Sequence, residues 1–233
     1  MGAVHRSRRG GSGRADSQAK LCSDGYIPMN TEKLTIDPAA QPPLNNYKLL
    51  IGSIVPRPIA FVSTISADGA RNLAPFSFFN AVCGNPPVVS FASGVRHPPK
   101  DTLANVRATG EFVVNIVTEE IAEKMNLTSG EYPADVDEFE ISGLTPVPSD
   151  VVKPPYVRES PINMECRLLQ IVEVSNRVLG GSLVLGEVIR FHIDPAITSE
   201  FRVDAEKLRA IGRMGGNEYT RTSCRFEMIR PQV

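Results

Sequence analysis

The chain has 233 residues, of which 42% are hydrophobic and 22% charged, and its formal net charge is -1. These values are ordinary for a soluble globular protein with one medium-sized domain and a sizeable core. No apolar run approaches the length needed to cross a bilayer, which excludes a membrane-spanning protein. Nineteen prolines and eighteen glycines indicate many turns and favour short strands over long helices.

The positive charge is concentrated at the N-terminus. Residues 1–20 hold five basic side chains against Asp16 alone, and we expect a disordered basic tail over residues 1–28. This tail has no aromatic residues to stack on bases, so a nucleic-acid partner is not expected. Arg8 and Arg9 are not followed by an apolar segment, so a secretion signal is not expected either. We therefore predict a cytoplasmic protein.

Four cysteines, Cys22, Cys83, Cys166 and Cys224, are widely separated and form no C-x-x-C pair. This spacing argues against a metal site and against a dense disulfide framework. Cys166 and Cys224 alternate with apolar residues, so both are interpreted as small core residues.

The first half of the chain predicts several strands. Ordered structure is expected to begin near residues 47–53. A strand over residues 58–65 leads through the turn at Ala67-Asp68-Gly69 into a second strand over residues 71–76. A short apolar strand is predicted over residues 88–92.

Two short helices are predicted next. Asp101 and Thr102 occupy the position of an N-cap before a helix over residues 103–107, and Gly110 ends it. After a buried strand over residues 111–117, Thr118 is predicted to cap a second helix. Residues 129–160 are rich in proline and acidic residues and predict a long surface excursion.

Three later stretches alternate between apolar and polar residues. They cover residues 162–174, 183–193 and 220–228, with a short helix predicted over residues 204–211. In the second stretch Leu183, Leu185, Ile189, Phe191 and Ile193 share the face expected to be buried. Period-two patterning over long runs indicates antiparallel strands with one buried side. The fold class predicted is therefore mainly β, a closed or partly closed antiparallel barrel with a few short helices.

Several familiar sites are missing from the sequence. No G-x-G-x-x-G follows a strand, no P-loop is present, and the three histidines lack metal-ligand spacing. His192 alternates with Phe191 and Ile193, which favours a structural role. A metal centre and a hydrolytic triad are not predicted.

Residues 72–80 combine small, hydroxyl, amide and aromatic side chains at the end of a predicted strand. An isoalloxazine ring needs such a surface, with an apolar wall and backbone groups near its pyrimidine edge. An ordinary strand and loop with buried phenylalanines would give the same pattern.

A candidate phosphate site lies further along the chain. Lys100, Asp101 and Thr102 offer a cation, a hydroxyl and the N–H groups of a helix start, and Ser93 and Arg96 precede them. Earlier in the chain, Arg57 stands between two prolines and could offer a bidentate fork to phosphate. A capped helix and a solvated turn arginine are the alternatives.

The order of these stretches closely resembles the flavin reductase-like, FMN-binding split-barrel family, and its flavoredoxin-like branch most of all. The resemblance extends over residues 44–231. It is carried by residues 52–64, 72–81 and 111–115, by Lys100-Asp101-Thr102 with Asn105, by Asp137-Glu138-Phe139, Gly143-Leu144, Glu165-Cys166 and Gly186-Glu187-Val188, and by Arg213-Met214-Gly215-Gly216 with Tyr219.

The resemblance implies a homodimer of split β-barrels with FMN near the subunit interface. By motif position the flavin and ribityl chain would contact Arg57, Ser63, Thr64, Asn72, Leu73, Ala74 and Ser77. The phosphate would be surrounded by Ser93, Lys100, Asp101 and Thr102, and Arg213 and Gly215 would reach the flavin from the C-terminal region.

Three functions are compatible with this resemblance. The first is reduction of FMN by NADH or NADPH, with hydride transfer to flavin N5 and a monooxygenase as a possible partner for the reduced flavin. The second is a flavoredoxin-type carrier that exchanges electrons with another protein, and the third is a flavin-binding module without turnover. Because the cofactor carries the chemistry, no catalytic residue is nominated. The electron donor and acceptor stay open.

Overall fold

The computed structural model describes residues 32–232. Residues 38–223 form one compact unit, and the described residues 32–37 and 224–232 lie outside it. Residues 32–37 and 224–232 contain no helix or strand, so every element below belongs to the compact unit. The disordered tail predicted over residues 1–28 lies outside the described residues.

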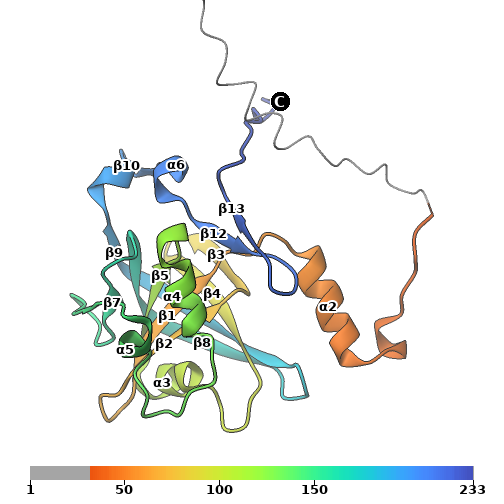
Figure 1. Ribbon diagram of the computed structural model, residues 1–233, viewed down its shortest axis with the longest axis horizontal. Helices are drawn as coiled ribbons and strands as arrows, with labels where there is room; N and C mark the ends of the chain where they lie inside the picture. The colour runs from red at the N-terminus through yellow and green to blue at the C-terminus, as the bar shows by residue number, and fades with distance from the viewer. Residues whose placement is uncertain (1–31, 233) are drawn as a thin grey trace, which may run out of the picture. The chain divides into compact units, whose positions relative to one another are not determined.

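A seven-stranded antiparallel sheet dominates this unit, in the order β2-β1-β5-β8-β9-β4-β3 (Figure 1). Its strands are β1 (Ala60–Ile65), β2 (Arg71–Phe76), β3 (Phe79–Gly84), β4 (Pro87–Gly94), β5 (Glu111–Ile116), β8 (Ile162–Ser175) and β9 (Gly181–Ile193).

The two edge strands of this sheet are neighbours in the chain. Only Ser77 and Phe78 separate β2 from β3, so the sheet must curl until its two edges meet. The rings of Phe76 on β2 and Phe91 on β4 then lie 4.9 Å apart, although no ladder joins β2 to β3 or β4. The barrel is therefore split at β2, which confirms the predicted fold class.

The inside of the barrel is a continuous apolar core. Its members alternate along the strands and are joined by two residues of helix α3 (Asp101–Thr109); they include Ala60, Val62, Phe76, Val89, Phe91, Leu103, Val106, Phe112, Val114 and Val184. Small residues make room for the large ones: a Cβ added to Gly186 would lie 2.2 Å from Cζ of Phe112.

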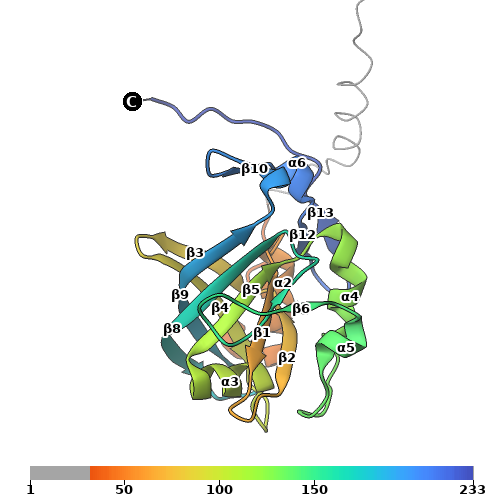
Figure 2. The ribbon, with the colours of Figure 1, turned by 90° about the vertical axis from the view of Figure 1, so that its left-hand side faces the viewer.

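A second apolar cluster covers the outer face of β1 and β2. Phe61 and Leu73 contribute from the strands, and Met125 and Phe139 from the helices α4 (Ala122–Leu127) and α5 (Glu138–Ser142), which lie against this face (Figure 2). The alternation of side chains thus supplies both an inner and an outer core.

The remaining elements are short, apart from α2. They are η1 (Pro38–Ala40), α2 (Pro43–Ser53), η2 (Glu119–Ile121), β6 (Pro146–Val147), β7 (Tyr156–Val157), η3 (Pro195–Ile197), β10 (Thr198–Ser199), β11 (Arg202–Val203), α6 (Ala205–Leu208), β12 (Ile211–Arg213) and β13 (Tyr219–Arg221). The excursion over residues 129–160 accordingly contains α5, β6 and β7. No helix among the described residues is long and apolar enough to span a membrane.

Both predicted caps of the central helices are wrong. Helix α3 begins at Asp101, with Lys100 as an N-cap that gives no side-chain hydrogen bond. Thr118 precedes η2 without capping it, because its hydroxyl is buried and has no hydrogen-bond partner. The side chains predicted to cap these two helices therefore make no capping hydrogen bond.

Two predictions fail in the C-terminal third. The helix predicted over residues 204–211 ends at Leu208, because Arg209 adopts a left-handed backbone conformation with φ of 49° and Ile211 joins β12. The strand predicted over residues 220–228 stops at Arg221, since β13 pairs only with the three-residue β12. Cys224 is exposed and disulfide-bonded rather than a core residue.

The buried face of β9 is the opposite of the one predicted. Ser182, Val184 and Val188 are buried, whereas Phe191 and Ile193 from the predicted face are 49% and 37% exposed. The inside of the barrel is already filled by large residues such as Phe112, so it accepts the smaller side chains of this strand. The larger ones remain on the outer surface.

Candidate functional site

A buried polar network connects the split edge of the barrel to helix α3. The side-chain amide of Asn72 donates to the hydroxyl oxygens of Thr64 at 3.2 Å and Thr102 at 2.8 Å. The amide of Asn105 donates to the same Thr64 oxygen at 3.1 Å. All four residues are buried, so the network fixes the first turn of α3 against β1 and β2.

Polar groups without protein partners gather at the start of this helix. The first N–H groups of a helix have no intrahelical acceptor, and Lys100 does not cap them. Ser93 is 1% exposed, and its hydroxyl has no hydrogen-bond partner. It shares the inner face of β4 with Val89 and Phe91, which directs it into the barrel interior that α3 helps to close.

Positive charge adjoins these groups. The Lys100 ammonium lies 5.4 Å from the centre of the Phe76 ring. Burial and the charge of Arg96 hold the pKa of Lys100 below its ordinary value, against the opposite effect of Glu131. The Arg96 guanidinium is 4.0 Å from the carboxylate of Asp101. Three of the predicted phosphate residues, Lys100, Asp101 and Thr102, thus occur at one helix start, and the fourth, Ser93, lies on the inner face of β4.

Arg57 has a different role from the predicted phosphate fork. Its guanidinium donates to the carbonyls of Ile51 at 2.6 Å, Ile54 at 2.9 Å and Met214 at 2.9 Å, and to the hydroxyl of Ser77 at 3.4 Å. These contacts occupy the N–H donors that a bidentate contact with phosphate would need. Arg57 therefore ties the end of α2 to the chain after β12.

The late motif lies next to Arg57. The backbones of Arg57 and Arg213 exchange hydrogen bonds of 2.9 and 2.8 Å. The Arg213 guanidinium is 4.5 Å from the centre of the Tyr219 ring. A Cβ added to Gly215 would lie 3.7 Å from Cα of Gly52. Arg213 and Gly215 thus lie beside Arg57 and the end of α2, and their contact with the flavin stays a prediction.

Three predicted flavin contacts are directed into the protein instead. Ser63, Thr64 and Leu73 are each 0% exposed. The Ser63 hydroxyl donates to the carbonyl of Pro155, and the Leu73 N–H donates to Glu138 at 3.0 Å. Strand alternation turns Ser63 and Leu73 to the outer core and Thr64 to the inner network. Their predicted contact with the flavin is not supported by this geometry.

Two residues near the site were not predicted as site residues. Asn105 follows Thr102 by one helical turn, and this i, i+3 spacing is the signal that places both on one face of α3. Glu138 is 7% exposed, and burial raises its pKa against the hydrogen bond from Leu73. No pattern in the sequence shows that Glu138 accepts the N–H of Leu73, which points away from the neighbouring strand β1.

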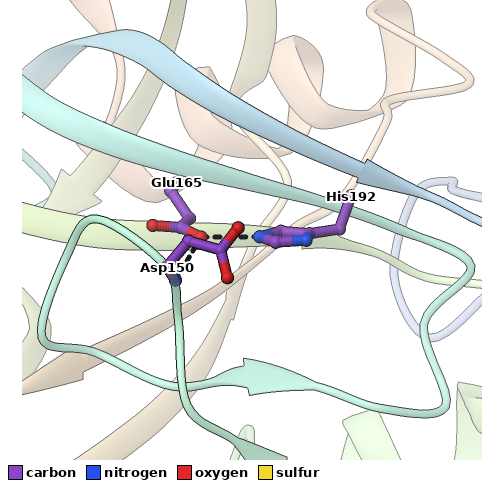
Figure 3. Close-up of side chains that lie close together, drawn as sticks. All are labelled: Asp150, Glu165 and His192. Carbon is purple, nitrogen blue, oxygen red and sulfur yellow. Dashed lines mark hydrogen bonds and ion pairs between the residues drawn. The ribbon is translucent and has the colours of Figure 1, made fainter.

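Asp150, Glu165 and His192 form a separate cluster (Figure 3). The buried Glu165 carboxylate accepts three backbone N–H groups of residues 150–152 at 2.8 to 3.0 Å, and its Oε1 lies 2.6 Å from Nε2 of His192. The His192 ring stacks on Tyr156 with centroids 4.8 Å apart. Each carboxylate oxygen already has two partners, so the geometry favours a structural cluster over a metal site, and His192 has the structural contacts expected of it.

Comparison with known proteins agrees with this fold. A model of the flavin reductase like domain matches residues 51–207. An uncharacterized protein of Aquifex aeolicus (strain VF5) is 46% identical over 187 residues, which cover 78% of this chain and 93% of that protein.

Two solved structures are similar over most of the chain. Nitrilotriacetate monooxygenase component B from Bacillus cereus has 37% identity and a TM-score of 0.83, covering 85% of this chain and 100% of that one. The 2-nitrobenzoate 2-nitroreductase NbaA of Pseudomonas fluorescens has 34% identity and a TM-score of 0.78, covering 85% and 96%.

The split barrel and these matches define a flavoprotein of the oxidoreductase or electron-transfer class. The chain belongs to the flavin reductase-like family, which confirms the resemblance carried by its motifs.

Proposed function

We propose that this protein binds FMN and reduces it with NADH or NADPH. The proposal rests on two observations: the buried Ser93 hydroxyl has no hydrogen-bond partner, and the half-buried Lys100 directly precedes helix α3. Buried hydroxyls are almost always hydrogen-bonded, so this position fits a ligand that supplies acceptors. A phosphate monoester provides several.

The residues at this helix start match the charge of the FMN phosphate. The phosphate carries between one and two negative charges, which Lys100, the positive end of the helix dipole and Arg96 can balance. Asp101 is the one acid in the group, and its carboxylate faces Arg96. The Thr102 hydroxyl accepts from Asn72 and keeps its own proton for donation.

The flavin ring is assigned to the split of the barrel. The edge strand β2 carries Asn72 and Ala74, and Ser77 comes directly after it. We keep these three residues as proposed flavin contacts, together with Arg213 and Gly215. In an antiparallel sheet the backbone groups of alternate residues of an edge strand point away from the neighbouring strand. In β2 these residues are Leu73 and Pro75. The Leu73 N–H already donates to Glu138. Carbonyl groups are therefore the main backbone groups left to contact the flavin ring.

The protein residues in this proposal position the cofactor and exclude water. When bound, FMN would supply a flavin N5 that accepts hydride from a nicotinamide, and the protein needs no acid–base pair for that step. A similar structure is named as component B of a monooxygenase, and we infer that reduced flavin made here passes to a monooxygenase partner.

A homodimer is also part of the proposal. Helix α2 has no buried residue, and Leu44, Leu49 and Leu50 on it are 50%, 44% and 52% exposed. Val172 and Val174 on β8 and Phe191 on β9 are exposed as well, at 37%, 70% and 49%. Contiguous exposed apolar surface commonly marks a protein interface, and the implied split-barrel dimer would cover it.

Absorbance and steady-state kinetics test the function. The purified full chain, reconstituted with FMN and desalted, should show a flavin band at about 450 nm and should oxidise NADH or NADPH. A yellow, fully loaded protein that oxidises neither would favour the electron carrier. Failure to retain or reduce FMN under any condition would refute the proposal.

A further inference from the structure

A second polar cavity lies away from the proposed flavin site. It has a volume of about 500 Å³ and is bordered by Thr118 after β5, by the chain around Arg158, by His192 on β9 and by Lys207 on α6. Thr118 follows the end of β5 that pairs with Ala60, whereas the network around Thr64 lies at the other end of β1. The two sites are therefore at opposite ends of these strands.

One wall of this cavity carries a buried hydroxyl without a partner. Thr118 is 5% exposed, and its Oγ1 makes no hydrogen bond. It lines the cavity, and its backbone is held in a bridge with Ala210. Since burying an unpaired hydroxyl is unfavourable, a polar group within the cavity would be stabilised at this position.

Two cations on the lining lack an anionic partner. Arg158 lines the cavity, and its side chain makes no hydrogen bond or ion pair with the described residues. Lys207 donates from its ammonium to the carbonyl of Ala196 at 3.1 Å, and no carboxylate of the described chain pairs with it. Both can therefore bind an incoming oxyanion without breaking an existing ion pair.

The acids of the lining are already engaged. Glu120 lies 3.6 Å from the guanidinium of Arg209, and Glu159 accepts from the backbone and hydroxyl of Thr145. Asp194 accepts the first N–H of η3. Glu120 is thus paired with a cation, and Glu159 and Asp194 are held by donors of the protein, whereas the Arg158 guanidinium and the Lys207 ammonium keep N–H donors for an anion.

His192 supplies a rigid side to the cavity. Its Nε2 is paired with the buried Glu165, and its ring stacks on Tyr156. Hydrogen bonds from His192 and the loop 150–152 outweigh the effect of burial and hold the pKa of Glu165 below its usual range. The carboxylate accepts and cannot donate, so Nε2 carries the proton and Nδ1 is the ring nitrogen left for a ligand or water.

We propose that this cavity binds the oxyanion group, phosphate or carboxylate, of a small molecule through Arg158, Lys207 and the Thr118 hydroxyl. The guanidinium matches either group with two parallel N–H donors. The cavity is large enough for a small metabolite. The proposal does not depend on flavin binding.

Calorimetric titration of the full chain with inorganic phosphate, and separately with succinate, tests it and distinguishes the two groups. Saturable binding of at least one anion is expected. Arg158→Gln and Thr118→Val should each weaken it by about tenfold, and Thr118→Ser should restore it. Arg177→Gln, at an exposed arginine in the β8–β9 turn, is the matched control and should bind as the unchanged chain does.

The flavin site could also take up phosphate, so the titration is repeated in Lys100→Ala. Binding retained there and lost in Arg158→Gln supports this cavity. Binding lost in Lys100→Ala but kept in Arg158→Gln would overturn the proposal. Absence of saturable binding with either anion would overturn it as well. Circular dichroism spectra establish that each variant is folded.

Discussion

At the scale of single residues, Lys100 is the charge on which the proposed phosphate contact depends. Lys100→Ala should weaken FMN binding by roughly tenfold to a hundredfold, because a charge-assisted contact is lost, and should leave riboflavin binding nearly unchanged. Fluorescence titration with both ligands measures this. Lys153→Ala, at an exposed lysine, is the control. Equal losses for FMN and riboflavin would contradict a phosphate contact.

Glu165 gives a prediction about pH. Its folded pKa is held low by His192 and three backbone N–H groups, against burial. A depressed carboxyl pKa contributes stability that is present above the unfolded value, about 4.3, and is lost as pH falls through the folded value. The unfolding free energy should therefore fall on acidification below that pH.

Urea unfolding at several pH values checks this for the unchanged chain and for Glu165→Gln. The variant should be less stable near neutral pH by roughly 1–3 kcal/mol, because an amide cannot accept from all these donors. Its stability should also depend less on pH in the acid range. A variant with the same acid dependence as the unchanged chain would assign that dependence to other groups.

At the scale of elements, Gly186 shows how closely the barrel interior is packed. Gly186→Ala places a methyl group into the Phe112 ring and should cost about 1–3 kcal/mol of unfolding free energy through overpacking. Gly52→Ala in α2 meets no atom within 4 Å and should be neutral or slightly stabilising, since alanine favours helices. Urea unfolding compares them. Equal effects would mean that the Phe112 contact is relieved without cost.

The same packing explains which elements could be predicted. The strand-favouring residues at 58–65 and the turn that follows predict β1 and β2, and the apolar stretch 111–117 predicts β5, because each of these strands pairs regularly. Strand β3 was not predicted, since its Asn80 and Gly84 interrupt the apolar pattern and its pairing with β4 is irregular between Ala81 and Cys83. Strand pairing, and not local propensity, determines this edge.

The candidate site could be predicted only in part, for a related reason. Motif positions placed Lys100 and Thr102 at the start of one helix, and their contact with a phosphate stays a prediction. They could not distinguish the inner from the outer face of β1 and β2, so Ser63 and Leu73 were included although both face the outer core. The partners of Arg57 come from α2 and from Met214, 157 positions away, and no local pattern shows such contacts.

At the scale of the whole molecule, the exposed outer face of β8 and β9 points to assembly. The sequence predicts Leu183 and Leu185 on a buried face, yet in the single chain they lie on the outer surface and are only partly buried. Val172 lies opposite Leu183 across the ladder and is 37% exposed. The alternating pattern over residues 183–193 predicts that this face is buried. A second copy of the chain that covers the face would bury Leu183 and Leu185 as predicted.

The paired change Val172→Glu with Leu183→Glu should therefore convert a dimer into a monomer, because it would bury charges in the interface. Light scattering after gel filtration should give twice the chain mass for the unchanged protein and the chain mass for the variant. Val178→Glu, at a residue 81% exposed in the hairpin turn, should stay dimeric. If both variants keep the dimer mass, the interface lies on another face of the protein. The exposed apolar side of α2 is then the next face to test.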